Sequence, residues 1–499
     1  MTKARLVTLT PVHIGNGIKY QHNVEFFTKN NYVYIIDPEK LLKELSKSNN
    51  NLVNIIQEWV EFIEEKNSDV ASFLKKNGIQ FDNVLLRKCL LHKIIKKNKE
   101  LHEQIYSPIN GFYIPGSSIK GAIKSCLLAF LTEEKKQQLK IDDLRTIENK
   151  DNKVIKNWSF NIVDNKIFGN YANTKLTRFI KVGDAFFKKI ETKVYYTEAL
   201  NADKNGWIMN KGIANLYEAI PENSEGIFDI KFDTELLSTI EKYIDKKEDY
   251  GVYEQFKNIF FAYEFPSKIN EVTKQMLQNE ISYFKKVEKV QLAIEGKKLL
   301  EKYKILEKII DQCKKNEFVI RLGGNSGYNF ITYKWFDKLP FFIEDEDKNE
   351  YNDLRKIVQK NNSNKDYSTE TFWPRTRKIT SDGIPFGFVK ISLLNENGLD
   401  KSIANYVEVK SREQAQVVPL LKEPEPFAGI LKQGMTNIVA KVVEPGKPNK
   451  VKLLIKDKDI ILQLDKYASE LEKDTLIYVK IDEFSKGLVK KVSYFGIYK

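Results

Sequence analysis

The clearest pattern in the chain is a helical stripe of apolar residues that begins at Ile119. Apolar side chains recur at intervals of three and four, at Ile119, Ala122, Ile123, Cys126, Leu127, Phe130 and Leu131. This spacing places all of them on one face of an α-helix. The pattern predicts an amphipathic helix buried on one side, directly after a turn-rich segment at 107–116.

Shorter runs on both sides of this helix predict β-strands and further helices. β-rich or alternating runs predict strands at 3–9, 177–182, 193–196, 227–232, 318–322 and 386–391, and a hairpin from 24–27 and 32–36. Asp37 and Pro38 then predict the start of a helix. Lys-rich segments predict helices at 52–74, 84–105, 235–262 and 271–315, with solvated outer faces. The mixture predicts an α+β fold with helical insertions.

The last 75 or so residues have a different pattern. Five short β-rich runs, at 436–444, 451–456, 459–464, 475–481 and 487–495, follow a proline-containing segment at 415–427 that indicates a linker. Five strands in so short a stretch favour a small closed barrel of the OB type, and a fragment of a β-sandwich is the alternative. An acidic, Asn-rich segment at 343–366 indicates a loop.

Composition limits the class of protein. A length of 499 residues predicts two or three domains. Three widely separated cysteines exclude a disulfide framework and make a cysteine zinc site improbable, and no apolar run reaches membrane-spanning length. We therefore expect a cytoplasmic protein without a membrane partner. The net charge of +13 fits a polyanionic partner, although a general lysine bias of the proteome explains it equally well.

The segment 114–125 has the chemistry of an anion site. The residues that define it are Gly116, Ser117, Ser118, Lys120, Gly121 and Lys124. A glycine and two serines at a helix start leave backbone N–H groups and the positive end of the helix dipole available. Glycine inside a helix costs about 1 kcal/mol, so Gly121 suggests close approach of a backbone or sugar. An ordinary capped helix with solvated lysines is the alternative, and the Walker A spacing is absent.

A second glycine-rich cluster follows the predicted strand at 318–322. It comprises Arg321, Gly323, Gly324, Asn325, Ser326 and Gly327, and a later basic segment contains Trp373, Arg375, Arg377 and Lys378. Aromatic side chains that stack on bases, with Arg and Lys on the phosphates, are typical of single-stranded RNA sites. The alternative is that these aromatic residues belong to the core.

His13 is the residue that could make the chain an enzyme. It lies in a loop with Gly15 and Gly17 directly after the first predicted strand, where a general base could reach an RNA 2′-hydroxyl. A hydrogen-bonding or stacking role is the more frequent one for such a histidine. No pair of carboxylates predicts a metal centre, and Asp184 stands apart from other acids at strand ends.

Taken together, these motifs resemble the RAMP proteins of type III CRISPR systems. The resemblance rests on 9–17, on the Pro-Gly-Ser-Ser-Ile-Lys-Gly core at 115–121, on 318–327, and on 373–377 with 384–390. It implies two ferredoxin-like (RRM-type) domains with helical insertions, at 1–225 and 226–412. The small all-β, OB-like domain at 428–499 lies outside the resemblance.

The segments at 318–327 and at 373–377 with 384–390 narrow the resemblance. They resemble the RAMP subunit of the type III-A (Csm) effector that caps the 3′ end of the guide. This implies a non-catalytic subunit, without metal or cofactor, that binds the 3′ part of the crRNA. It also implies contact with the terminal backbone RAMP subunit and support of crRNA maturation by partner nucleases. By this resemblance His13, Ser117, Ser118, Lys120 and Gly121 carry over as motif residues near RNA. The full set of predicted RNA contacts is His13, Gly15, Gly17, Gly116, Ser117, Ser118, Lys120, Gly121, Lys124, Arg321, Gly323, Gly324, Asn325, Ser326, Gly327, Arg375, Arg377 and Lys378.

Two other functions stay open. One is a metal-independent CRISPR repeat-processing endoribonuclease of the same superfamily, which would use His13; such enzymes usually carry their glycine-rich loop near the C-terminus. The other is a structural adaptor that never contacts RNA, which the Arg375 and Arg377 pair argues against.

Overall fold

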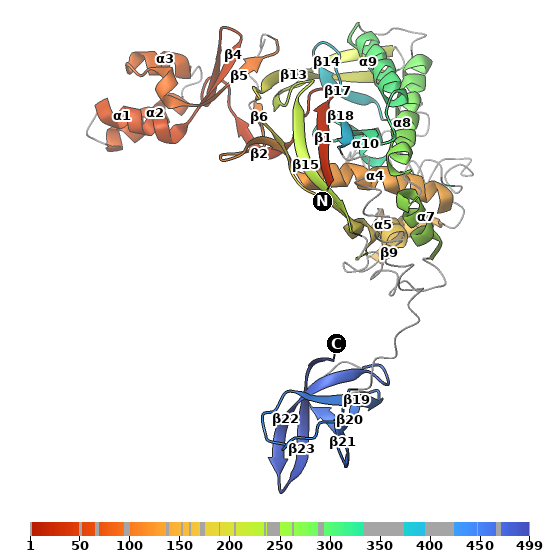
Figure 1. The fold of residues 1–499 in the computed structure, drawn as a ribbon. Coiled ribbons are helices and arrows are strands. Elements are labelled where there is room, and N and C mark those ends of the chain that lie inside the picture. The colour runs from red at the N-terminus through yellow and green to blue at the C-terminus, as the bar shows by residue number, and fades with distance from the viewer. Residues whose placement is uncertain are drawn as a thin grey trace. The chain divides into compact units, whose positions relative to one another are not determined.

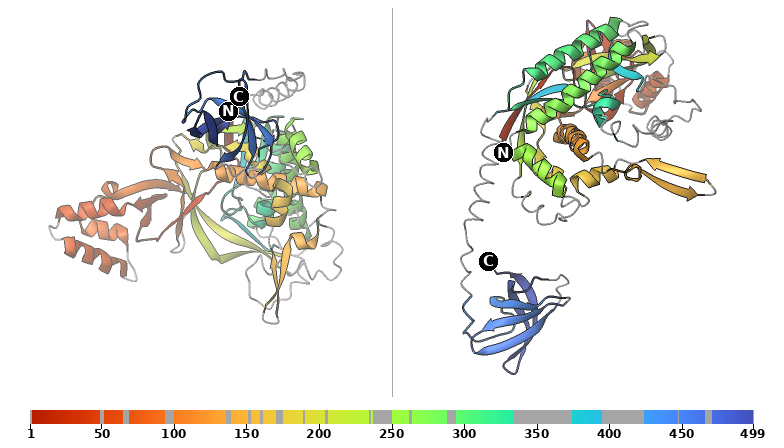
Figure 2. Two further views of the ribbon diagram at one scale, coloured as in Figure 1. Left: turned by 90° about the horizontal axis from the view of Figure 1, so that it is seen from below. Right: turned by 90° about the vertical axis from the view of Figure 1, so that its right-hand side faces the viewer.

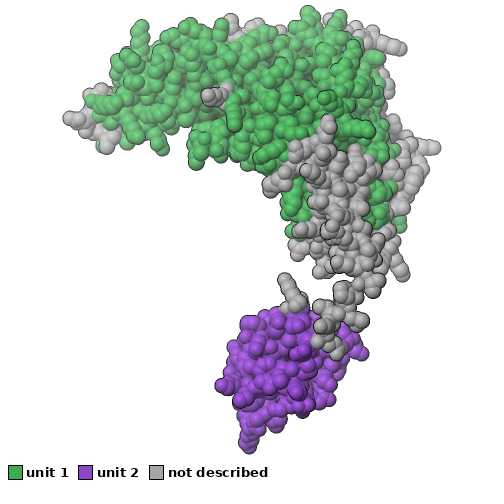
Figure 3. Space-filling view, viewed as in Figure 1, with its two compact units in different colours: residues 1–407 green, residues 408–499 purple. Residues whose placement is uncertain are grey.

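The computed structural model contains two compact units, Met1–Val407 and Glu408–Lys499, which Figure 3 shows in different colours. The described residues are 2–48, 52–64, 69–93, 100–135, 139–150, 153–158, 161–169, 175–188, 190–203, 206–233, 236, 250–261, 264–287, 294–333, 339, 374–394, 424–446, 448–465 and 471–498. The predicted loop at 343–366 lies outside these ranges. So do Trp373, most of the predicted linker at 415–427, and 237–249 of the predicted helix at 235–262.

A first sheet of eight strands joins the start, the middle and the end of unit 1 (Figure 1). Its strand order is β16-β18-β1-β15-β12-β8-β7, and β11 also pairs with β15. The strands are β1 Thr2–Thr8, β7 Tyr106–Ser107, β8 Gly111–Ile114, β11 Ile180–Val182, β12 Ala185–Phe187, β15 Glu225–Phe232, β16 Glu317–Arg321 and β18 Phe388–Leu393. The central strand β1 is antiparallel to both β15 and β18, so residues almost 390 apart become neighbours.

Long helices pack against this first sheet. They are α4 (Gly116–Lys135), α8 (Phe265–Val287) and α9 (Ile294–Asp311), and α8 contacts α4, α9 and β16. The predicted stripe of α4 is confirmed, because Ile119, Ile123, Cys126, Leu127 and Leu131 are all buried. Figure 2 shows α8 and α9 side by side across the sheet.

A second sheet of eight strands forms the rest of the unit. Its order is β2-β6-β14-β13-β5-β4-β3, with β17 on β13. The strands are β2 Gly15–Tyr20, β3 Phe26–Lys29, β4 Tyr32–Ile36, β5 Leu85–Leu91, β6 Leu101–Gln104, β13 Lys193–Asp203, β14 Gly206–Ala219 and β17 Thr376–Thr380. The predicted hairpin of β3 and β4 is confirmed.

The prediction of helices at 84–105 is wrong. This segment contains β5 and β6, which lie in the middle and near one edge of the second sheet. The runs of leucine and lysine there fit either type of element by pattern alone. Strand β5 forms because it pairs with β4 on one side and with β13 on the other. An insertion separates β4 from β5, and β13 lies far along the chain, so a local pattern does not record either pairing.

Three helices are inserted between β4 and β5, and we call them, with β3, β4 and β5, the arm. They are α1 (Pro38–Ser48), α2 (Leu52–Glu64) and α3 (Val70–Lys76). Asp37 accepts hydrogen bonds from two backbone N–H groups of the first turn of α1, as predicted. The single helix predicted at 52–74 is divided into α2 and α3, and Asp69 caps α3. The arm has a core of its own, which includes Leu41, Phe62, Val70 and Leu74.

The remaining elements of unit 1 are short. They are helices α5 Asn161–Phe168, α7 Tyr250–Phe261 and α10 Tyr328–Thr332, the hairpin of β9 Arg145–Lys150 and β10 Lys153–Trp158, and 3-10 turns at Phe81–Val84, Ile141–Asp143 and Leu176–Phe179. The strand predicted at 177–182 is therefore half 3-10 turn and half β11.

Unit 2 is a closed barrel of five strands, as predicted. The strands are β19 Ile438–Glu444, β20 Lys450–Ile455, β21 Lys458–Asp465, β22 Leu476–Ser485 and β23 Leu488–Ile497, in the order β19-β20-β21-β23-β22. One pair, β21 and β23, is parallel. Closure removes the free edges that a sandwich fragment would leave exposed.

The two predicted RAMP ranges contribute strands to the same sheet. The boundary at 225/226 falls at the start of β15, and strands from both sides of it pair in the first sheet. The ranges 1–225 and 226–412 therefore do not form two separate compact units; residues 1–407 form one.

Candidate nucleic-acid interface

At the start of α4, a backbone N–H group is hydrogen-bonded to an acid for which the sequence predicted no role. The backbone N–H of Gly116 donates to Asp184 Oδ1 at 2.8 Å. A side chain at Gly116 would bring its Cβ to 2.3 Å from the carbonyl oxygen of Val182, so only glycine fits. Of the N–H groups predicted to be available to an anion, that of Gly116 is therefore already engaged. Ser117 is exposed and Ser118 is half-buried.

One turn further along α4, a basic surface is open. Gly121 is exposed, and a Cβ added there would meet no atom within 4 Å. Half-buried Lys120 lies beside it. Burial lowers the pKa of Lys120, and the positive charges of Arg178, Lys181 and Lys124 lower it further. No carboxylate among the described residues forms an ion pair with Lys120, so its charge is available to a polyanion.

The neighbouring cations are partly neutralised. Lys124 forms an ion pair with Asp164, which also holds Lys175 at 3.0 Å. Lys181 pairs with Asp233, yet its side chain stays 52% exposed. Lys120, Lys124, Arg178 and Lys181 thus form a surface with excess positive charge around an exposed glycine, and we call it the α4 surface. The sequence motif identified Lys120, Gly121 and Lys124, whereas Arg178 comes from the 3-10 turn at Leu176–Phe179 and Lys181 from β11.

The second glycine cluster packs tightly against the protein's own backbone, with Arg321 and Ser326 buried and Gly327 exposed. Gly323 has φ +82°, and a Cβ there would lie 2.5 Å from the backbone oxygen of His13. Gly324 N–H donates to that same oxygen at 2.8 Å, and Ser326 Oγ donates to the Gly323 carbonyl at 2.7 Å. The two motifs predicted at 13–17 and 323–327 therefore meet, but through tight backbone packing. Asn325 and Gly327 also adopt positive φ, at 63° and 77°.

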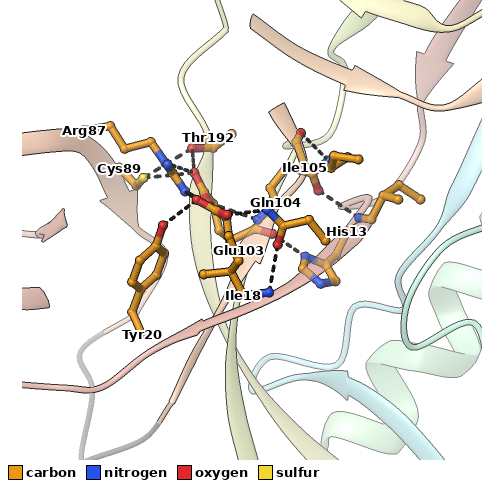
Figure 4. A network of polar contacts seen from close by, with 12 residues as sticks. His13, Ile18, Tyr20, Arg87, Cys89, Glu103, Gln104, Ile105 and Thr192 are labelled. Carbon is orange, nitrogen blue, oxygen red and sulfur yellow. Dashed lines mark hydrogen bonds and ion pairs between the residues drawn. The ribbon is translucent and has the colours of Figure 1, made fainter. Parts of the chain in front are cut away.

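His13 is buried next to Gly323 and Gly324, and Figure 4 shows its ring beside a network of polar contacts. Its Nδ1 lies 2.6 Å from the backbone oxygen of Glu218, so Nδ1 carries the proton and donates. Burial lowers the pKa of His13 to about 4, and the ring packs on Tyr217 with centroids 4.9 Å apart. A buried, neutral and hydrogen-bonded imidazole argues against direct contact with RNA and against general-base catalysis.

A buried charge network holds the neighbouring loop (Figure 4). Arg87 Nη2 lies 2.8 Å from Glu103 and 2.6 Å from Glu218, and Arg87 Nε donates to Glu218 at 2.9 Å. Tyr20 and Asn16 donate to Glu103. Asn16 is thereby fixed at the start of β2, where Gly15 and Gly17 are both exposed, so the loop predicted at these two glycines is the beginning of a strand.

The predicted arginine contacts differ in burial. Arg321 is buried between the rings of Phe330 and Phe388, and its Nε donates to the Phe386 carbonyl at 2.8 Å. Arg377 is buried as well, with two nitrogens on the Glu280 carboxylate at 2.6 and 2.9 Å. Their burial and satisfied hydrogen bonds argue for structural roles. Arg375 and Lys378 are half-buried and reach the surface.

A further basic surface, which the sequence did not reveal, lies next to Gly15 and Gly17. Lys19 of β2 is opposite His102 of β6 in the sheet register. His102 is half-buried and stacks on Tyr217, with ring centroids 4.5 Å apart and planes inclined by 16°. Burial lowers the pKa of His102, and the charges of Lys19 and Lys378 lower it further. Lys19 is paired with Glu100 at 2.9 Å, so Lys378 and the half-exposed Lys19 give this surface its positive charge. A stacked ring beside such cations is a suitable site for an RNA base. Pattern alone could not have paired residues 19, 102 and 378.

Metal chemistry has no visible site in the described part of the chain, where no group of three or more His, Cys, Asp or Glu side chains is arranged to hold an ion. Among the same residues, no helix has the length and apolar composition needed to cross a membrane.

Comparison with known families identifies the superfamily of the chain. The model of the RAMP superfamily matches residues 5–481. This chain belongs to the RAMP superfamily. The resemblance inferred from the motifs is therefore confirmed, and the RAMP match includes part of the C-terminal barrel.

Two curated relatives of this RAMP chain have the name "CRISPR system Cms protein Csm5". The protein from Methanocaldococcus jannaschii is 24% identical over 264 residues, and the one from Streptococcus thermophilus is 30% identical over 139 residues. The matches cover 50% and 25% of this chain. They span 58% and 37% of the relatives, which is less than two thirds of either.

Two solved structures share the fold of this RAMP chain. A chain from "Cryo-EM structure of Csm-crRNA-target RNA ternary complex in type III-A CRISPR-Cas system" has a TM-score of 0.57 and 19% identity, and the match covers 79% of this chain and 100% of that chain. "Crystal structure of T.onnurineus Csm5" has a TM-score of 0.51 and 17% identity, with 77% and 99% coverage.

Proposed function

We propose that this RAMP chain is a non-catalytic subunit of a type III-A (Csm) effector complex and binds its crRNA. The observation that carries the proposal is the α4 surface, where Lys120 and an open Gly121 lie among Lys124, Arg178 and Lys181. Such a surface suits the phosphates of a polymer, because it combines excess positive charge with room for close approach of a backbone. The names of the curated relatives agree with this function, as does the Csm-crRNA-target RNA complex in which a chain of similar fold is found.

The surface of Lys19, His102 and Lys378 supplies a second RNA contact in this proposal. It adds a stacking ring to the charged contacts, and the neighbouring exposed backbone at Gly15 and Gly17 leaves space for a nucleotide. His13, Arg321, Gly323 and Arg377 hold these loops in place from beneath. The predicted motifs thus contribute in two ways, some as RNA contacts and some as supports.

The finer assignment also belongs to the proposal. The chain would bind the 3′ part of the crRNA, cap the filament of backbone RAMP subunits at its terminal copy, and support maturation by host nucleases that trim the RNA. Its unit 1 would derive from two ferredoxin-like domains. Support comes from the motif resemblance at 318–327 and 384–390 and from the relatives' names.

The proposal disfavours the endoribonuclease. That activity would use His13 as a general base, but the His13 imidazole is buried and its Nδ1 proton is held by the Glu218 carbonyl. The chain's contribution to maturation is then to protect RNA and recruit partners, without cleavage of its own.

Charge reversal on the α4 surface tests RNA binding. Lys120→Glu and Lys181→Glu should each weaken binding of a fluorescent, crRNA-like single strand by about tenfold near 100 mM salt, measured by anisotropy. The salt dependence should also decrease by about 0.7 in log–log slope for each phosphate that the variant no longer neutralises. Lys304→Glu is the control matched to Lys181→Glu, because Lys304 is also half-exposed and paired with an acid, on α9. Equal affinities for all three variants would refute the assignment of the α4 surface.

Reconstitution tests the capping role. An effector assembled without this chain should contain RNA with altered 3′ ends and a variable number of backbone subunits, measured by RNA sequencing and native mass spectrometry. Unchanged RNA ends and subunit number would remove the capping role and leave RNA binding intact.

A further inference from the structure

Helix α2 of the arm has an apolar face that points to solvent. Ile56, Val60 and Ile63 are 55%, 44% and 44% exposed. Their spacing of four and three residues places them on one face of the helix. Phe62 and Trp59, on another face, belong to the arm's own core. Helix α2 is thus apolar on two sides, and only one of them is covered within the described part of the chain.

Such a helix is unusual on a protein surface. A helix that is apolar around much of its circumference is normally buried on both sides. Single exposed aliphatic side chains are common, whereas a contiguous row of them marks a contact site. The row on α2 consists of large β-branched residues, which lose little side-chain entropy when they are covered.

The charges of α2 restrict what can cover it. The helix contains Glu58, Glu61 and Glu64 and neither lysine nor arginine, in a chain with a net charge of +13. Helical geometry places Gln57, Glu61 and Glu64 along one edge of the apolar row, and all three are exposed. Gln57 Nε2 donates to Glu61 at 3.0 Å. An acidic edge repels RNA phosphates and anionic lipids, and two copies of this face would place glutamates opposite each other.

The arm is also remote from the α4 surface. The arm joins the second sheet through the pairing of β5 with β13, and its strand β3 forms one end of that sheet, whereas α4 packs against the first. Figures 1 and 2 both show α1, α2 and α3 at the opposite end of the unit from α4 and α5. RNA on the α4 surface therefore leaves the α2 face accessible.

We propose that the face of Ile56, Val60 and Ile63 docks a second protein subunit of the effector, through an apolar patch edged by Lys or Arg. This proposal rests on the proposed function, because the partner belongs to the same assembly. One helix face is smaller than the roughly 800 Å² that each partner buries in a standard interface. The contact therefore acts within the assembly, where RNA and other subunits already hold the two proteins close together.

The test compares three variants of the full-length chain in an effector reconstituted from purified, identified subunits and crRNA. The first replaces the apolar row by Ile56→Gln, Val60→Gln and Ile63→Gln, which keeps helix propensity high. The second is Glu61→Lys at the acidic edge. The third is the control Lys43→Gln, an exposed change on α1. Retention of each subunit is measured by quantitative mass spectrometry, together with RNA affinity and thermal unfolding of the chain alone.

The triple variant should reduce retention of one identified subunit by about tenfold, which corresponds to about 1.4 kcal/mol. Glu61→Lys should reduce it by a smaller factor that vanishes at high salt. RNA affinity should stay within twofold, and the unfolding temperature should not fall. The control should match the unmodified chain in every measurement.

Four outcomes would overturn the proposal. Full retention of every subunit by the triple variant would show that the face is not used. A lower unfolding temperature would show that the chain itself covers the face, and weaker RNA binding would make it an RNA contact. A dimer of the unmodified chain that the triple variant abolishes would make a second copy the occupant. Failure of the unmodified chain to bind RNA would refute the proposed function alone, because subunit retention is measured separately.

Discussion

The two glycine-rich clusters look alike in sequence and differ in what surrounds them. Both combine glycines and a serine with a basic residue, at 116–121 and at 321–327. Gly121 faces open space, and Lys120 beside it has no carboxylate partner among the described residues. A Cβ added at Gly323 would lie 2.5 Å from the carbonyl oxygen of His13. Arg321 is buried between two aromatic rings.

The difference shows that glycine can be required for two opposite reasons. At Gly121 the absent side chain leaves room for a molecule outside the protein. At Gly323 it leaves room for the protein's own backbone, which approaches too closely for any Cβ. A basic residue next to glycine is a ligand-binding residue only in the first case.

The largest expected effect lies in the buried region. Arg377→Ala should lower the free energy of unfolding by about 3–5 kcal/mol, because the buried Glu280 carboxylate then loses its partner. Urea denaturation measures this, and Arg377→Met combined with Glu280→Leu should recover much of the loss. If Arg377→Ala left stability unchanged and weakened RNA binding, Arg377 would be an RNA contact after all, and burial would no longer separate supporting residues from RNA contacts.

The two glycines themselves give a matched pair. Gly323→Ala should destabilise the chain by more than about 2 kcal/mol, because positive φ and a backbone clash add together. Gly121→Ala should stabilise α4 by up to about 1 kcal/mol and weaken RNA binding. Thermal or urea denaturation and RNA anisotropy distinguish the two. Similar stability effects at both positions would contradict the comparison.

The burial of His13 predicts a dependence of stability on pH. Its pKa is about 4 in the folded chain and about 6.5 when unfolded, so between these values the unfolded state binds more protons. Stability should therefore fall as pH decreases from 6.5, by about 3 kcal/mol at pH 4 from this group. Denaturation at several pH values should give a shallower decline for His13→Gln. Equal slopes for the two proteins would mean that His13 is accessible to solvent.

The smallest expected effect concerns the C-terminal barrel. Lys450 and Lys452 alternate with buried residues of β20 and so face outward, but they lie 2.7 and 2.8 Å from Glu444 and Asp459. A chain that ends before residue 424 should therefore bind the crRNA-like strand within about threefold of the full chain, measured by anisotropy. A tenfold loss would make the barrel a single-strand RNA site in its own right.

Local patterns predicted the elements that they specify by themselves. The stripe from Ile119 predicted α4, Asp37 predicted the start of α1, and five alternating runs predicted the five strands of the barrel. Each of these signals depends on neighbours within a few residues. The segment 84–105 failed because leucine and lysine runs suit both element types, and only pairing with β4, β13 and β14 made β5 and β6 strands.

The candidate site follows the same division. The sequence by itself determined the family, through short motifs with characteristic residues, and the types of chemistry available in each motif. Tertiary structure alone decided which of those residues face a partner. It buried His13, Arg321 and Arg377, it brought Arg178 and Lys181 to Lys120, and it placed His102 beside Lys19 and Lys378. Exposure and charge clustering depend on strands that pair across hundreds of residues, and no local pattern records that pairing.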